Sequence, residues 1–117
     1  MRLFLLVLMS FSVGGSELRA NVVPEWTYQQ KLRQSEIVVI ATVSSANVTT
    51  AISTARVILK VKGSSPRTIH VHTSHPVAEM RTRCCRKGAT YMMFLRKTGG
   101  SFYEPVNGRF GLVEIGR

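Results

Sequence analysis

Aspartate is absent from this chain of 117 residues, and its acidic side chains are six glutamates. Carboxylate dyads, Ser-His-Asp triads and oxygen-rich calcium loops all depend heavily on aspartate. The serines lie in no nucleophile-elbow pattern, and no Asn or Asp stands near the histidines to orient one of them as a base for a cysteine nucleophile. We therefore expect a protein that is not an enzyme.

Long apolar runs are also scarce, and the one clear example extends from Leu3 to Val13. It follows Met1-Arg2 and precedes a segment ending in the small residue Ala20, which is the layout of a secretory signal peptide. The run is shorter than the roughly 20 residues that a membrane-spanning helix needs. We therefore expect a signal peptide over residues 1–20, no transmembrane segment in the mature chain, and a secreted or periplasmic protein.

The remaining residues, 21–117, suffice for a single small domain with a modest core. The whole chain has a formal net charge of +10, and removing Arg2, Arg19 and Glu17 leaves 14 Lys and Arg against 5 Glu, or +9. This balance predicts attraction to anionic surfaces such as lipid headgroups or acidic polysaccharides. The alternative is that the charge only keeps a small domain soluble.

Most of the mature sequence has the β-branched, alternating pattern of short strands. A short helix is expected first, over residues 24–35, with Pro24 in its first turn. Five or six strands in so short a chain indicate a mainly β fold, a small β-barrel or a sandwich. The expected strands cover residues 36–48, 53–63, 68–74 and 89–97, followed by a final hairpin of 101–106 and 109–115 around Asn107-Gly108.

Two of these strands have informative patterns. The run "ATYMMFLRK" is continuously apolar, which suits a central strand that is covered on both faces. The strand at 53–63 alternates instead, which predicts one apolar and one mostly cationic face. Its expected apolar face holds Ala55, Val57, Leu59 and Val61, and its other face holds Arg56, Ile58, Lys60 and Lys62.

Three motifs follow one another in a recognisable order: "SEIVVIATVSS", then "ILKVKGSS", then a cysteine-bearing loop before "KGATYMMFLRK". This order resembles the netrin-like, tissue-inhibitor-of-metalloproteinases-like superfamily from Ser35 to Leu95. The closing "NGRFGLVEI" is consistent with the last hairpin of its bacterial exported members. The resemblance implies a five-stranded OB-type barrel with a flanking helix.

The chain departs from the inhibitors of that superfamily at its expected mature N-terminus. Those inhibitors use an N-terminal cysteine whose α-amino group reaches the zinc of the protease. Here the mature chain is expected to begin at Asn21, and no cysteine precedes Cys84. We therefore expect the scaffold without that inhibitory chemistry, because a fold does not carry its function with it.

Cysteine is rare, and the only two, Cys84 and Cys85, are adjacent. Neighbouring Cα atoms lie about 3.8 Å apart across a trans peptide, below the usual minimum of roughly 4.4 Å for a disulfide. A vicinal disulfide, an intermolecular bridge and buried or free thiols all remain open, and so does a redox role. Nearby cations would favour the thiolate form.

The segment "RTRCCRK" is the densest positive stretch of the sequence. Loops beside the open face of an OB-type barrel often bind ligands, and the arginine fork fits carboxylate or phosphate. We therefore predict a binding module that engages a protein partner or an anionic envelope component through this basic loop, with a merely solvated loop as the alternative. The expected binding residues are Arg67, Arg81, Arg83, Arg86 and Lys87.

The segment "HVHTSH" suggests a second class, a small envelope protein that binds copper or zinc. His70 and His72 project from one strand face about 6.6 Å apart, and His75 or a soft sulfur ligand such as Met80 could complete a site. No carboxylate stands nearby in sequence to orient the rings, and solvated surface histidines are the alternative. Apart from such a metal, no cofactor is expected.

Nucleic acid is an unlikely partner, because barrels that bind it add stacking aromatics on one face. In this sequence Trp26 and Tyr28 fall in the expected helix. We expect Phe94, Phe102 and Phe110 to serve the core.

Overall fold

The structure, a computed structural model, describes residues 24–74 and 84–116. The predicted signal peptide lies outside these residues. None of the helical segments in the described part is long and apolar enough to cross a bilayer. Its elements are α2 (Tyr28–Gln34), β1 (Ile37–Asn47), β2 (Ile52–Lys62), β3 (Thr68–His72), β4 (Thr90–Lys97), β5 (Tyr103–Pro105), the 3-10 turn η3 (Gly108–Gly111) and β6 (Leu112–Gly116).

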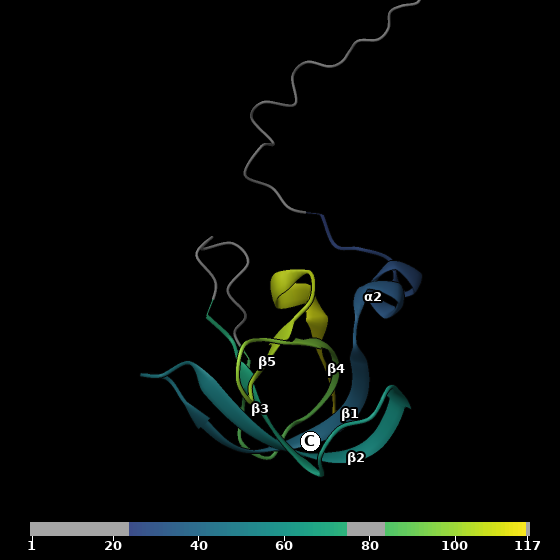
Figure 1. Cartoon of the computed structure of the whole chain (residues 1–117). Helices are drawn as coiled ribbons and strands as arrows, with labels where there is room; N and C mark the ends of the chain where they lie inside the picture. Colours follow the sequence, from purple (N-terminus) through teal and green to yellow (C-terminus); the bar gives the residue numbers. More distant parts are fainter. Residues whose placement is uncertain (1–23, 75–83, 117) are drawn as a thin grey trace, which may run out of the picture.

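The first five strands close into a barrel, visible as a ring in Figure 1. β1 pairs antiparallel with β2 on one edge and with β4 on the other. β2 continues to β3, which meets β5 in the one parallel pairing, and β5 returns to β4. This closed mixed barrel with one short helix confirms the expected small OB-type barrel, while β6 is an extra strand added to β4.

The barrel interior is filled by alternate residues of the paired strands, as the period of a strand requires. Val39 and Ala41 of β1 point inward, and so do Met93 and Leu95 of β4, all with no exposed surface. The same cluster includes the inward residues of β2, β3 and β5. The core of the domain therefore lies inside the ring of strands.

A second, smaller cluster lies outside the ring, between the barrel and α2. Phe94, Val38 and Val106 are buried there, and Trp26 and Leu32 pack against them. β4 therefore has both faces covered, as its continuous apolar run predicts.

Helix α2 begins at Tyr28, four residues later than predicted, because Thr27 caps it. The Gln30 amide donates to Thr27 Oγ1 at 3.1 Å, and the Thr27 amide donates to Gln30 Oε1 at 2.8 Å. This reciprocal capping box satisfies two donors that a helix start otherwise leaves open. Pro24 therefore precedes the helix and takes no part in its first turn.

Replacing Thr27 with alanine is expected to lower the free energy of unfolding by about 1 kcal/mol, because the cap is lost. Thr27→Ser, which keeps a hydroxyl acceptor, should retain most of that stability. Urea denaturation followed by the fluorescence of Trp26, the only tryptophan, measures both. Equal stability of the alanine and serine variants would contradict the assignment of the cap.

Strand β2 differs from its predicted alternation. Its register with β1 shifts where Ile40 pairs with Leu59 but the next residue, Ala41, pairs with Val57. The skipped residue Ile58 forms a bulge, so Val57 packs toward the core while Leu59 lies on the outer face. An inserted residue reverses the facing of the residues that follow it, as far as the next bulge. The prediction of one apolar face through Leu59 and Val61 was therefore wrong, and both side chains are exposed.

The predicted final hairpin was also wrong, because β5 and β6 do not pair with each other. β5 pairs with Leu95–Lys97 of β4, and β6 pairs with Thr90–Met93 of the same strand. Asn107 and Gly108 do turn the chain, both with positive φ, but the 3-10 turn η3 follows. That extra turn shifts the chain along β4 before the last strand begins.

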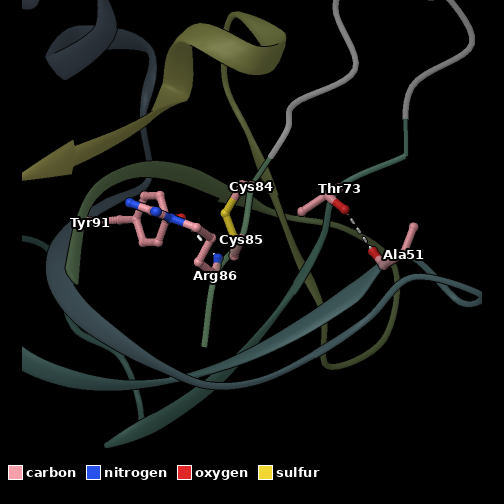
Figure 2. The surroundings of a disulfide bond; sticks show 6 residues. All are labelled: Ala51, Thr73, Cys84, Cys85, Arg86 and Tyr91. Atoms are coloured by element: carbon pink, nitrogen blue, oxygen red, sulfur yellow. Dashed lines mark hydrogen bonds between the residues drawn. A yellow bond between two sulfur atoms is a disulfide. The ribbon is translucent and has the colours of Figure 1, made fainter. Parts of the chain in front are cut away.

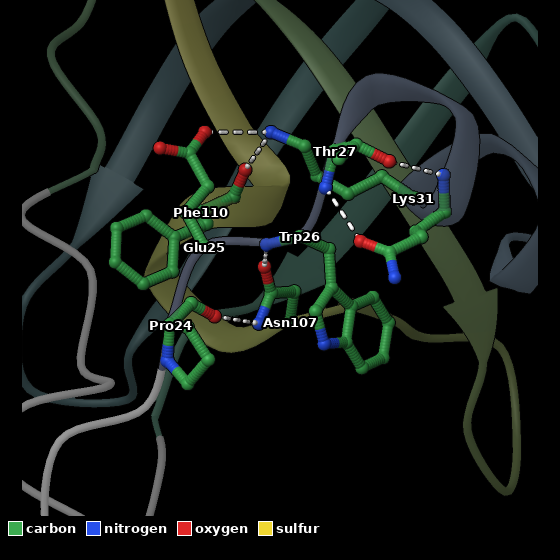
Figure 3. Close-up of polar contacts among 8 residues, drawn as sticks. Pro24, Glu25, Trp26, Thr27, Lys31, Asn107 and Phe110 are labelled. Carbon is green, nitrogen blue, oxygen red and sulfur yellow. Dashed lines mark hydrogen bonds and ion pairs between the residues drawn. The ribbon is translucent and has the colours of Figure 1, made fainter. Parts of the chain in front are cut away.

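The turn before η3 is tied to the segment that enters α2, as Figure 3 shows. The Trp26 amide donates to Asn107 Oδ1 at 2.7 Å, and Asn107 Nδ2 donates to the Pro24 carbonyl at 3.3 Å. Lys31 Nζ contacts Glu25 Oε2 at 2.9 Å and donates to the Phe110 carbonyl at 3.1 Å. The segment around the start of α2 and the segment 107–110 thus hold each other in place.

Candidate anion-binding site

A tight turn before β4 places the described part of the basic loop against β1. Gly88 has φ of 89°, which glycine adopts without strain, and the Ala89 amide donates to the Arg86 carbonyl at 3.0 Å. Val43 of β1 exchanges hydrogen bonds with Gly88 and Ala89 at 2.8 and 2.9 Å. The backbone of Arg86 is therefore fixed near Val43 of β1, just before β4 begins.

Of the five predicted binding residues, Arg86 and Lys87 lie at this end of the barrel. Arg81 and Arg83 lie outside the described residues. Arg67 is separate, because its neighbours Pro66 and Thr68 line a second cavity together with Lys97, at the opposite end of β4. The structure therefore does not bring Arg67 into one site with Arg86.

A cavity of about 410 Å³ opens beside Arg86. One wall comes from the loop before β4 and from β4 itself, and the other comes from η3 and β6. Cationic, aromatic and aliphatic side chains share the lining. The residues that line it are Cys84, Arg86, Tyr91, Arg109, Phe110, Leu112 and Glu114.

Arg86 is held at the cavity by two contacts. Its guanidinium forms an ion pair with Glu114 of β6, and its backbone amide donates to the Tyr91 hydroxyl at 2.9 Å. The hydrogen bond to Glu114 raises the pKa of Arg86 above its ordinary value. Figure 2 shows Arg86 beside Tyr91 and the cysteines.

Arg109 is the cation that sequence reasoning missed. Its guanidinium carbon lies 4.8 Å from the centre of the Phe110 ring, in the range of a cation–π contact. Among the described residues, no carboxylate lies within ion-pair distance of Arg109. Because it lines the same cavity as Arg86, a second guanidinium faces the space that an anion would occupy.

Phe110 and Phe102 are not the core residues that we expected. Phe110 lines the cavity beneath Arg109, and Phe102 lines the second cavity, while only Phe94 is fully buried. For Phe110 the reason is the 3-10 turn η3, which contains this residue, so Phe110 does not have the inward position that a hairpin strand would have given it.

Cys84 and Cys85 are joined to each other by a disulfide across a cis peptide bond. Both pack against the barrel core, and Cys84 also lines the cavity (Figure 2). The loop that carries the cations is therefore anchored by apolar sulfur contacts. A redox role of this pair stays a prediction.

The two described histidines point outward from β3, as their alternation with Ile69 and Val71 predicts. His70 Nδ1 lies 3.0 Å from Thr54 Oγ1, and its ring meets Phe102 edge-on at 6.1 Å. His75 lies outside the described residues, within which no group of three or more His, Cys, Asp or Glu gathers as a metal site would require. A copper or zinc site thus stays a prediction.

The fold defines the class of this protein as a small OB-type barrel. Neither the protein-family models nor the curated proteins compared with the chain give a match. Its function is therefore argued from the cavity: two guanidinium groups, a phenol and an aromatic ring can bind a carboxylate or phosphate beside an apolar group.

Proposed function

We propose that this protein is an exported, non-enzymatic binding module that engages a protein partner or an anionic envelope component through its basic loop and Arg109. The observation that carries this proposal is the Arg109 guanidinium, which lies on Phe110 and lacks a carboxylate partner in the described part of the chain. Arg86 lines the same cavity and is already paired with Glu114. An incoming anion would meet Arg109 first.

The composition of the cavity favours a protein partner with an acidic segment. Arginine, tyrosine and phenylalanine are enriched at protein interfaces and dominate their binding energy. Arg86, Tyr91, Arg109 and Phe110 supply these types together. The resemblance to the netrin-like superfamily agrees with a barrel used as an interaction scaffold.

Binding of a hexaglutamate peptide to the mature chain tests this proposal, because the peptide supplies carboxylates and little else. Arg109→Ala should weaken binding about tenfold, the effect of losing one charge-assisted hydrogen bond. Arg33→Ala, which removes the same charge from the exposed side of α2, should change it less than about twofold. Isothermal titration calorimetry measures both variants.

Two further comparisons sharpen the test. Raising the salt concentration from about 0.01 M to about 0.15 M should weaken binding, because screening acts on exposed charges. Glu114→Gln should strengthen it, because the Arg86 guanidinium is released from its ion pair. Equal losses in Arg109→Ala and Arg33→Ala would show attraction by net charge alone and would contradict a site at the cavity.

A further inference from the structure

The second half of β2 exposes more aliphatic surface than a barrel strand needs. Ile58, Leu59 and Val61 are 61%, 54% and 41% exposed. Single exposed aliphatic residues are ordinary, but three within four consecutive positions form a contiguous patch. Lys60 and Lys62 alternate with them, and these five residues, Ile58–Lys62, are called the β2 patch below.

The backbone of β2 explains why these side chains do not reach the core. Its pairing with β1 skips Ile58 and then skips Val61, so two bulges fall within five residues. β3 pairs only with the first half of β2, as far as Arg56. The β2 patch is therefore paired on one edge to β1, and its side chains spread to the outside of the barrel.

The charged residues of β1, β2 and β3 are all positive. No Asp or Glu occurs in the sequence between Glu36 and Glu79, a stretch that includes all of β1, β2 and β3. Arg56 and Lys60 are exposed beside the aliphatic residues. β1, β2 and β3 therefore contribute no carboxylate to the surface around the β2 patch.

We propose that the β2 patch docks the protein on an anionic lipid surface. Exposed aliphatic side chains can enter the boundary between headgroups and acyl chains, and lysine stems can lie along them with their ammonium groups among the phosphates. Juxtaposed basic residues add attraction to anionic headgroups. Ile58, Leu59 and Val61 supply the first element, and Lys60, together with the neighbouring exposed Arg56, supplies the second.

The composition favours lipid over a protein partner or a second copy of the chain. Protein interfaces are enriched in aromatic residues and arginine and depleted in lysine, whereas the β2 patch has no aromatic residue and two lysines. Two copies meeting through this patch would bring lysine against lysine without an intervening carboxylate. An anionic bilayer satisfies both the charge and the apolar surface.

The β2 patch and the loop of the anion-binding cavity meet opposite edges of β1. Lys62 pairs with Val38 near the start of β1, and its Nζ donates to the Leu32 carbonyl of α2 at 2.8 Å. The cavity loop instead meets Val43. Docking through the β2 patch would thus leave the cavity open, so this inference does not depend on the proposed function.

Vesicles of phosphatidylcholine with and without phosphatidylglycerol test the inference with the full mature chain. A nitroxide placed near the top of the acyl chains should broaden the methyl NMR signals of Ile58, Leu59 and Val61. The equally aliphatic and exposed Val113 and Ile115 of β6 should remain sharp. Pure phosphatidylcholine vesicles should bind weakly, because they lack net negative charge.

Variants separate the patch from general basicity. The triple variant Ile58→Ser/Leu59→Ser/Val61→Ser should lower partitioning into the anionic vesicles by about tenfold or more. The matched control Val113→Ser/Ile115→Ser should change it less than about twofold, and so should Arg109→Ala. Because the wild-type broadening map needs no substitution, the test holds even if the triple variant is unstable.

Three outcomes would overturn the inference. They are no binding to the anionic vesicles, methyl broadening centred on the cavity residue Leu112, and equal partitioning of the wild-type and triple variants. A wild-type chain that dimerises through the β2 patch without lipid, detected by sedimentation, would assign the patch to a second copy instead.

Discussion

Phe94→Ala is expected to lower the free energy of unfolding by about 3–5 kcal/mol, the range for truncating a buried phenylalanine. Phe94 is 1% exposed and fills the outer cluster together with Val38 and Val106. Its ring meets Tyr28 edge-on at 5.7 Å, and Lys31 Nζ lies 5.1 Å from its centre. Alanine would leave a cavity between α2 and the barrel.

This loss is large against the stability of a small domain, about 5–15 kcal/mol. The matched control is Phe102→Ala, which truncates the same side chain at the half-buried β4–β5 loop. It should cost clearly less, because less surface is transferred to water. Urea denaturation followed by circular dichroism compares them. Equal losses would contradict the assignment of Phe94 as the residue that joins α2 to the barrel.

Asn107→Ala should be the second most damaging change, at about 2–5 kcal/mol. The 6% exposed side chain of Asn107 accepts from the Trp26 amide and donates to the Pro24 carbonyl, and losing such buried bonds costs about 1–3 kcal/mol. Its φ of 57° adds a cost for alanine of about 1–2 kcal/mol. Thermal and urea denaturation measure the total.

Two further variants at Asn107 separate these contributions. Asn107→Gly removes the hydrogen bonds but tolerates the positive φ, so it should be more stable than Asn107→Ala. Asn107→Asp keeps an acceptor for the Trp26 amide, but it loses the donor to Pro24 and places a buried carboxylate beside that carbonyl. If glycine and alanine were equally unstable, the backbone conformation would contribute nothing and that part of the explanation would be wrong.

The barrel could be predicted because its strands carry local signals. The continuous apolar run before Arg96 predicts a strand that is covered on both faces. β4 is such a strand, because Met93 is buried in the barrel core and Phe94 is buried in the outer cluster. The alternation of His70 with Ile69 and Val71 likewise placed the histidines outside. Each of these patterns depends on only one strand.

The errors arise where two strands must be registered against each other. Nothing in "RVILKVK" marks Ile58 as the residue that pairing with β1 will skip, because the bulge depends on the curvature of the closed barrel. Arg109 was missed for a similar reason. In a hairpin it would be an ordinary strand residue, and only the η3 turn brings it beside Arg86.

The most direct test of the central claim is a map of amide chemical shifts in residues 21–117 during titration with hexaglutamate at low salt. The account predicts that the largest changes centre on the cavity, at Arg86, Lys87, Arg109, Phe110 and Leu112, and that they disappear in Arg109→Ala. Changes spread evenly over the cationic surface, or centred on α2, would contradict an anion-binding site at this end of the barrel.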